Sequence, residues 1–194
     1  MTRYDIINQF IKDRNYNSFL EIGTAQGETF RQVIAPIRVS VDPDEKTMAT
    51  FRMTSDDFFA MCKNKFDIIF IDGLHEHKQA FRDVKNALQF LNEGGVVVMH
   101  DCLPTSELMQ EYPRSPHNYI WTGDVWKAFV ALRTEQPYEM YTIDTDYGCG
   151  IIDTTLKKKS STTKLPKDME TLTYDQFTSN RDKWMNVKEG IINA

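Results

Sequence analysis

Short apolar runs alternate with amphipathic segments through the first hundred residues. Most of these runs are continuous, which is typical of strands buried on both faces of a parallel sheet. They predict strands at residues 18–23, 37–42, 51–53, 66–71 and 96–99. Helices are predicted at residues 4–14 and 29–34, between Pro43 and Met48, after the polar residues 55–57, and at 75–91. The alternation of strands and helices indicates an α/β fold.

The pattern changes after residue 101. Residues 103–123 contain three prolines and no clear periodicity, and irregular segments of this length are usually functional or mobile. A helix is predicted at 125–133, two linked strands at 139–144 and 149–153, and an amphipathic helix at 174–188. We therefore expect a doubly wound, mostly parallel seven-stranded sheet with helices on both faces and an antiparallel last strand. This domain would cover residues 1–153, and the polar connector and helix of residues 154–194 would pack on it.

The composition fits one globular domain: 194 residues, 41% of them hydrophobic and 26% charged, with a net charge of −5. The one lysine run, residues 157–159, lies in a polar segment, and the lack of a basic stripe disfavours nucleic acid as a substrate. Three widely spaced cysteines disfavour a disulfide framework. There is no signal-peptide core and no apolar run near the roughly 18 residues of a membrane span. We expect a cytoplasmic protein that acts on a small molecule and has no membrane partner.

A glycine-containing turn follows the first predicted strand. Its residues are Glu21-Ile22-Gly23-Thr24-Ala25-Gln26-Gly27. Glycine permits a tight turn and close approach of a ligand to the backbone beside a helix N-terminus. The three-glycine pattern of dinucleotide sites is incomplete, because position 25 is alanine. The turn alone therefore indicates either a ligand site or a plain connection between strand and helix.

Asp42 ends the second predicted strand, about 20 residues after the glycine turn. Doubly wound nucleotide-binding folds place an acidic residue here to bind the ribose hydroxyls. Taken alone, Asp42 could instead cap the segment that follows Pro43. The glycine turn and Asp42 together favour a ligand that contains a nucleoside.

These residues resemble the cofactor site of class I S-adenosylmethionine-dependent methyltransferases. The resemblance rests on the acidic residue and glycines of the turn, on Asp42, and on Asp56 after the third predicted strand, and it covers roughly residues 15–153. It implies that the glycine turn lines the methionine part of S-adenosylmethionine, that Asp42 binds the ribose, and that Ser55 and Asp56 lie near the adenine. The implied cofactor-binding residues are Glu21, Gly23, Thr24, Gly27, Asp42, Ser55, Asp56 and Asp72.

Acidic residues and histidines follow the next two predicted strands. Asp72 and His75 come after one strand, and His100 and Asp101 come after the other. Because the carboxyl ends of parallel strands meet at one edge of the sheet, we expect these side chains in one cleft. Two carboxylates and an imidazole can hold a divalent cation and leave positions open for substrate oxygens. The plainer alternatives are a helix cap for Asp72, a surface position for His75, and a local hydrogen-bonded pair for His100 and Asp101.

The same residues resemble the site of metal-dependent small-molecule O-methyltransferases of the macrolide-sugar and cephalosporin-tailoring type. Those enzymes carry Asp-Gly-x-His after the fourth strand and an acidic residue followed by Asp after the fifth. The resemblance implies that Asp72, His100 and Asp101 bind a divalent cation, expected to be Mg²⁺. It also implies that His75 is the general base. At His100 the relatives have an acid, and this departure weakens the preference for magnesium.

Four other residues and segments receive plainer interpretations. We interpret His77 as a surface residue and Trp126 as a packing residue. Residues 103–123 would form part of a lid over the acceptor. The C-terminal helix would dock on the sheet, or form a homodimer contact.

The sequence therefore favours a methyltransferase that moves the methyl group of S-adenosylmethionine to a hydroxyl of a small molecule, such as a sugar or a glycosylated metabolite. One alternative is a nucleic-acid or amine N-methyltransferase. Such enzymes usually carry an Asn/Asp-Pro-Pro-Tyr-like segment where this chain has Asp72-Gly73-Leu74-His75. A nicotinamide-dependent oxidoreductase fits the incomplete glycine pattern less well. A non-catalytic cofactor-binding protein of the same fold is the third alternative.

Overall fold

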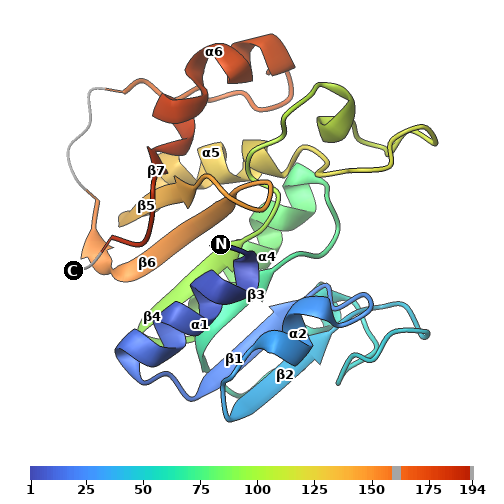
Figure 1. Ribbon diagram of the computed structural model, residues 1–194, viewed down its shortest axis with the longest axis vertical. Coiled ribbons are helices and arrows are strands. Elements are labelled where there is room, and N and C mark those ends of the chain that lie inside the picture. Colours follow the sequence, from blue (N-terminus) through green and yellow to red (C-terminus); the bar gives the residue numbers. More distant parts are fainter. Residues whose placement is uncertain (159–162, 193–194) are drawn as a thin grey trace.

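The computed structural model describes residues 1–158 and 163–192, which form one mixed sheet with helices on both faces (Figure 1). The sheet order in the described residues is β2-β1-β3-β4-β6-β5-β7. Its strands are β1 (Ser18–Ile22), β2 (Ile37–Val41), β3 (Phe66–Ile71), β4 (Leu91–Met99), β5 (Tyr138–Ile143), β6 (Cys149–Lys157) and β7 (Val187–Lys188). Strands β1 to β4 pair in parallel, and β6 is antiparallel to both β4 and β5. The predicted fold class is confirmed.

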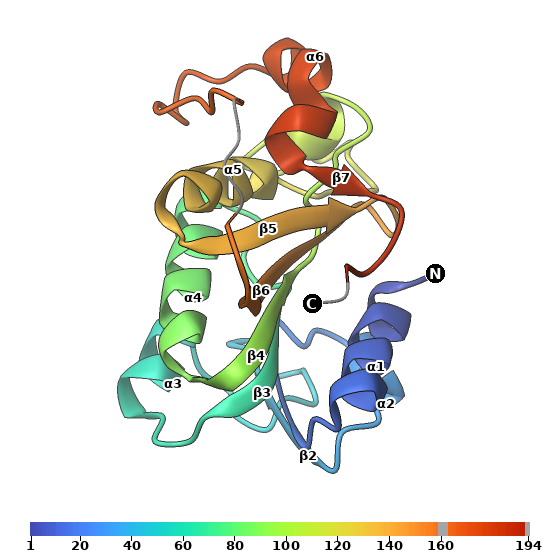
Figure 2. The ribbon, with the colours of Figure 1, turned by 90° about the vertical axis from the view of Figure 1, so that its left-hand side faces the viewer.

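Helices cover the sheet as two layers, which Figure 2 shows with the sheet nearly edge-on. The helices are α1 (Arg3–Arg14), α2 (Glu28–Gln32), α3 (Ser55–Met61), α4 (His77–Gln89), α5 (Val125–Glu135) and α6 (Tyr174–Met185), with a short 3-10 turn at Leu108–Gln110. α1 and α2 pack on one face, and α3, α4 and α5 pack on the other, with α6 beside α5 and β7. Burial on both faces explains why the central strands are continuous apolar runs.

α1 illustrates how the sequence sets an element's ends. The Thr2 side chain accepts a hydrogen bond from the backbone N–H of Asp5, and the Asp5 carboxylate accepts one from the backbone N–H of Thr2. Asn15 ends the helix in the left-handed conformation. Between these caps, the buried residues are Ile6, Ile7, Phe10 and Ile11. None of the helices in the described part of the chain is long and apolar enough to cross a membrane.

The structure corrects two predicted elements between β2 and α3. No helix forms between Pro43 and Met48, because Asp42 and Asp44 accept hydrogen bonds from backbone N–H groups two residues ahead. Such local side-chain bonds compete with helix formation. Residues 51–53 are no strand either, since only Phe51 forms an isolated bridge with Val41. The seventh strand is instead β7, a short strand parallel to β5 that begins where the predicted C-terminal helix was expected to continue.

The polar connector after residue 153 also differs from the expectation. β6 runs to Lys157, beyond the predicted end of its strand. Residues 159–162, in the middle of the predicted connector, lie outside the described residues, as do residues 193–194. α6 packs on α5 through Phe177, whose ring centroid lies 4.6 Å from that of Trp126. The helix therefore docks on the same domain.

Candidate active site

Two adjoining cavities open at the carboxyl ends of the parallel strands. The smaller cavity, about 490 Å³, lies among the glycine loop (residues 23–27), the end of β2, and the starts of α3 and α4. The larger cavity, about 570 Å³, lies among the glycine loop, the end of β4, and the long loop (residues 103–123). Four residues line both cavities: Gly23, Ala25, Asp72 and His75. The two cavities therefore share a wall at the ends of β1 and β3.

The glycine loop needs glycine at its first position. Gly23 has a φ of +86°, and a Cβ atom there would lie 2.0 Å from the carbonyl oxygen of Asp72. Gly27 has a φ of +70° and is the N-cap of α2. Gly23 and Thr24 line the cavities, whereas Gly27 lines neither. Gly23 thus lets β1 approach the residues after β3, and Gly27 shapes the turn into α2.

Asp42 lies at the rim of the smaller cavity, at the end of β2. Its Oδ2 accepts a hydrogen bond from the backbone N–H of Ala25 at 2.8 Å, and its Oδ1 accepts one from that of Asp44 at 2.9 Å. These bonds fix the carboxylate, and each oxygen retains a lone pair for a further donor such as a hydroxyl group.

The starts of α3 and α4 form another wall of the smaller cavity. Ser55 and Asp56, the residues expected near the adenine, line it, and Thr54 is the N-cap of α3. Gln79 and Asp83 line it too, and our sequence analysis did not identify them. Asp83 is an acid beside Val84 on the apolar face of α4, and this break in the pattern is the signal that could have revealed it.

Glu21 is buried at the end of β1 and lines the larger cavity. Its Oε2 is fully buried and has no hydrogen-bond partner. Burial raises the pKa of Glu21 to about 9, and the neighbouring Asp72 acts in the same direction. A buried carboxyl without a donor is costly unless a ligand supplies one. Glu21 is therefore suited to a cationic group of a bound molecule.

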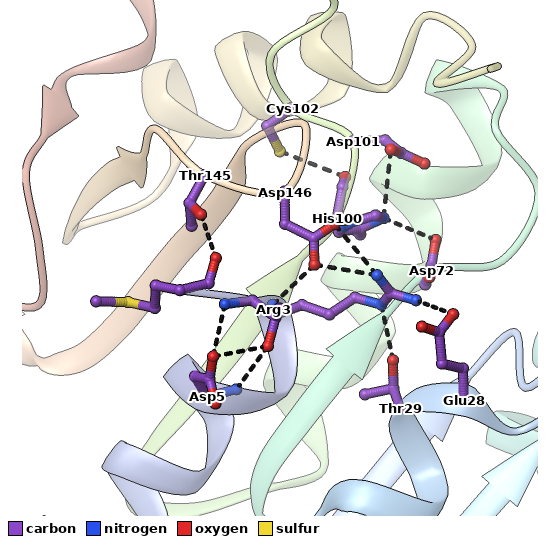
Figure 3. Close-up of polar contacts among 12 residues, drawn as sticks. Arg3, Asp5, Glu28, Thr29, Asp72, His100, Asp101, Cys102, Thr145 and Asp146 are labelled. Atoms are coloured by element: carbon purple, nitrogen blue, oxygen red, sulfur yellow. Dashed lines mark hydrogen bonds and ion pairs between the residues drawn. The ribbon is translucent and has the colours of Figure 1, made fainter.

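The four predicted residues after β3 and β4 lie together in the larger cavity, as Figure 3 shows in part. His100 Nδ1 lies 3.3 Å from Oδ1 of both Asp72 and Asp101. His75 Nε2 lies 3.4 Å from Asp72 Oδ1, and His75 Nδ1 lies 3.3 Å from Asp101 Oδ2. Asp101 has a φ of +59°, in the left-handed region that non-glycine residues adopt rarely. The parallel-strand rule thus predicted the cluster.

The pKa values of the cluster follow from burial opposed by the neighbouring charges. Burial alone would raise the pKa of Asp72, but His100 and His75 outweigh it and hold this pKa well below its usual value. Burial alone would lower the pKa of both histidines. The carboxylates of Asp72 and Asp101 outweigh it, so the pKa of His75 is raised and that of His100 is raised further. The metal-free cluster is therefore an ionic network.

A residue at the start of α1 completes this network, and no local sequence pattern pointed to it. Arg3 donates hydrogen bonds from Nη1 to both carboxylate oxygens of Asp146, in the turn between β5 and β6 (Figure 3). Asp146 Oδ1 in turn lies 3.5 Å from His100 Nε2. Burial alone would raise the pKa of Asp146, but His100 and Arg3 lower it well below its usual value. The turn and α1 therefore hold the outer side of the His100 ring.

The long loop fixes the ring of His75. The imidazole stacks on the indole of Trp121 with a centroid distance of 4.8 Å, and His75 Nδ1 lies 3.0 Å from the Trp121 carbonyl oxygen. Because a carbonyl oxygen can only accept, Nδ1 carries the hydrogen, and in the neutral ring Nε2 holds the free lone pair. Gly123, two residues later, packs against the backbone of His75. A Cβ atom at Gly123 would lie 1.8 Å from the His75 carbonyl oxygen, so only glycine fits there.

The interpretation of His77 as a surface residue is wrong. Its backbone N–H donates to Asp124 Oδ1 at 2.7 Å, and its Nδ1 lies 2.7 Å from Asp124 Oδ2. Asp124 starts α5 without a side-chain cap bond, because its carboxylate is turned to His77. This pair joins the starts of α4 and α5 and so supports the loop that carries His75. Trp126 is fully buried, in agreement with the packing role.

Ligand atoms that could hold a metal ion come together at this cluster. One atom each from Asp72, His75 and Asp101 can be chosen so that all lie within 4.8 Å of one another. The ligand set expected from the sequence contained His100 in place of His75. His100 is also adjacent to the carboxylates of Asp72 and Asp101. Either His75 or His100 is therefore close enough to these carboxylates to be the third ligand.

Comparison with known proteins agrees with this architecture. Residues 20–102 match a sequence family described as "Methyltransferase domain". No curated protein matches the chain with significant similarity. Among solved structures, an S-adenosylhomocysteine-bound methyltransferase from Podospora anserina has a TM-score of 0.60 at 15% identity, over 81% of this chain and 78% of that one.

Two O-methyltransferases have the same fold. The enzyme from Bacillus cereus, in complex with S-adenosylhomocysteine, has a TM-score of 0.56 at 14% identity, over 78% of this chain and 80% of that one. TomG from Streptomyces achromogenes, in complex with S-adenosylmethionine, has a TM-score of 0.56 at 16% identity, over 78% and 79%. The domain match over residues 20–102 and the shared fold agree with the class I S-adenosylmethionine-dependent methyltransferases that the sequence resembles.

Proposed function

We propose that this chain methylates a hydroxyl oxygen of a small molecule with the help of a divalent cation. The observation that carries the proposal is the cluster of Asp72, His75 and Asp101, in which Asp72 and His75 line both cavities and Asp101 lines the larger one. A cluster in this place can act on an acceptor in the larger cavity while the cofactor extends along the smaller one. The described O-methyltransferases of the same fold, such as TomG, agree with an oxygen acceptor.

The residues of the smaller cavity fit S-adenosylmethionine. Its volume of about 490 Å³ is within the range of cofactor and small-ligand sites. The fixed carboxylate of Asp42 suits the two ribose hydroxyls. In the larger cavity, the unpaired Oε2 of Glu21 suits the ammonium group of the methionine part. When bound, S-adenosylmethionine supplies a methyl group on a sulfonium, which is already reactive and needs mainly in-line alignment.

The donor set also fits a divalent cation. Asp72 and Asp101 would hold it, with His100 as the imidazole ligand. A mixed set of carboxylates and imidazole accepts Mn²⁺, Fe²⁺ or Zn²⁺ as readily as Mg²⁺. A cation bound there would lower the pKa of an acceptor hydroxyl and counter the carboxylates that raise the pKa of His75.

His75 is the base in this proposal. The Trp121 carbonyl oxygen accepts the Nδ1 hydrogen, so Nε2 is the atom that takes the proton from the acceptor hydroxyl. Stacking on the Trp121 indole holds the ring in the cavity wall. Trp121, with Tyr119 and Ile120, also lines the side of the larger cavity and would exclude water from a bound acceptor. A sugar or glycosylated metabolite would present hydroxyls to the acidic floor and its apolar face to these side chains.

Calorimetry with S-adenosylhomocysteine tests the cofactor, and a methylation assay on a panel of hydroxylated sugars and glycosides tests the acceptor. We expect the cofactor product to bind and turnover to require Mg²⁺ or Mn²⁺. Asp101→Ala should abolish metal binding measured by calorimetry with Mn²⁺, while Lys85→Gln, on the outer surface of α4, should leave it unchanged. His75→Ala should lower turnover and retain Mn²⁺ binding. Loss of Mn²⁺ binding in His75→Ala, with its retention in His100→Ala, would make His75 a ligand instead of the base.

A further inference from the structure

The smaller cavity contains a buried acid that the proposed chemistry does not use. Asp83 lies on α4, is 1% exposed, and lines the cavity beside Gln79. The Gln79 amide donates to Asp83 Oδ1 at 2.9 Å. None of the ion pairs among the described residues includes Asp83, and its neighbour Arg82 pairs with Asp56 instead. A nearly fully buried carboxyl group at a cavity wall without a basic partner is unusual.

The surroundings of Asp83 leave its charge poorly compensated. Burial raises the pKa of Asp83 to about 6, and the charge of Asp56 raises it further. Hydrogen bonds from Ser55 and Gln79 and the charge of Arg82 act in the opposite direction without cancelling the effect. A buried acceptor of this kind gains most from a donor that a ligand brings into the cavity.

The position of Asp83 in the cavity indicates which part of the cofactor would reach it. Asp42, at the end of β2, would bind the ribose, and Asp83 lines the same cavity from α4. The Gln79 amide donates to both Ser55 and Asp83, so Asp83 lies beside the residues expected near the adenine. Ile22, Val41 and Leu74 line this cavity too, and their apolar side chains suit a flat aromatic ring. A purine attached to a ribose at Asp42 would therefore point its outer edge toward α4.

We propose that Asp83 accepts a hydrogen bond from the 6-amino group of the cofactor's adenine and so selects adenine over 6-oxo purines. This inference rests on the proposed placement of S-adenosylmethionine. A carboxylate only accepts hydrogen bonds, and the 6-amino group of adenine donates two. A 6-oxo purine presents an acceptor at the same place, which a carboxylate repels. Asp56 is the other acid at this end, but its side chain is 50% exposed, so water competes for it.

Calorimetry with S-adenosylhomocysteine and its 6-oxo analogue, S-inosylhomocysteine, tests the inference. We expect wild type to prefer the adenine form by roughly 10- to 100-fold, the range expected when one buried hydrogen bond is replaced by an unpaired acceptor. Asp83→Asn, whose amide can donate to a 6-oxo group, should reduce this ratio to within about threefold or invert it. Asp13→Asn, at an exposed position of α1 that lines neither cavity, is the matched control, and it should keep the wild-type ratio.

A second measurement needs no variant and remains decisive if Asp83→Asn does not fold. As the pH falls through about 6, Asp83 becomes protonated and can donate to the 6-oxo group, so the wild-type preference for adenine should shrink. Asp56 and Arg82 are the charged groups that act on Asp83, and taking the ratio of two ligands removes effects common to both. An unchanged ratio between pH 5 and pH 8, or in folded Asp83→Asn, would overturn the inference. Failure of wild type to bind either ligand would instead contradict the proposed function.

Discussion

Arg3 connects three separate parts of the chain, so replacing it tests how far α1 supports the site. In Arg3→Met the aliphatic stem remains and the guanidinium is lost. The guanidinium donates two hydrogen bonds to Asp146, at 3.2 and 3.0 Å, one to Thr29 at 2.7 Å and one to Glu28 at 2.9 Å. The Glu28 side chain is 70% exposed, so this ion pair contributes at most about 1 kcal/mol.

The bond to Asp146 dominates the expected loss of stability. The side chains of Arg3 and Asp146 are 16% and 15% exposed. Removing one member of a buried pair costs about 3–5 kcal/mol because the other charge stays buried. Asp146 retains a hydrogen bond from the backbone N–H of residue 3 and its contact with His100. We therefore expect Arg3→Met to lower the free energy of unfolding by about 3 kcal/mol, at the lower end of that range.

Urea denaturation at pH 7 measures this loss, with Glu28→Gln as the control that should cost less than about 1 kcal/mol. Arg3→Met combined with Asp146→Asn should cost much less than the sum of the single changes. Arg3 and His100 lower the pKa of Asp146 below its ordinary value of 3.8, so their stabilisation is present above that pH and is lost as the pH falls below it. A loss under about 1 kcal/mol in Arg3→Met, or strict additivity in the double variant, would refute the reasoning.

Two further predictions concern the walls of the larger cavity. Gly123→Ala should lower the free energy of unfolding in urea by more than about 1 kcal/mol and should lower turnover. Gly123 has a φ of +58°, and a Cβ atom there would strike the His75 carbonyl oxygen. Gly190→Ala is the control, because an added Cβ atom there meets nothing within 4 Å. Equal stability of the two variants would count against the contact. Glu21 has a pKa of about 9 in the folded protein, against an ordinary value of 4.5. Its contribution to the free energy of unfolding is therefore fully present below pH 4.5 and is lost as the pH rises through 9. The Tm of Glu21→Gln should therefore rise relative to wild type with increasing pH, and parallel curves would contradict the assignment.

The strand ends were predictable because one rule governs them. Asp42, Asp72, His100 and Asp101 each follow an apolar run, and the carboxyl ends of parallel strands meet at one edge whatever the loops do. This reasoning located the two cavities without any knowledge of side-chain orientation. The same local patterns predicted the six helices of the described residues, with boundaries shifted by a few residues.

The remaining parts of the site depend on contacts between distant segments, which carry no local pattern. Arg3 and Asp146 are 143 positions apart, and neither position differs in the sequence from an ordinary surface charge. His77 and Asp124 meet only because α4 and α5 pack side by side. The helix predicted between Pro43 and Met48 was wrong for the opposite reason, because a local interaction overrode the composition. Hydrogen bonds from the nearby backbone to Asp side chains replace the helical ones.

The loop from Asp72 to His75 has a consequence for how two ligands bind. Asp72 and His75 of this loop line both cavities. A cofactor that holds the loop in one arrangement would therefore change the binding free energy of the acceptor. Such coupling is reciprocal, so the acceptor must change cofactor affinity by the same factor. The shared wall would thus couple the binding of the methyl donor to that of the acceptor within a single small domain.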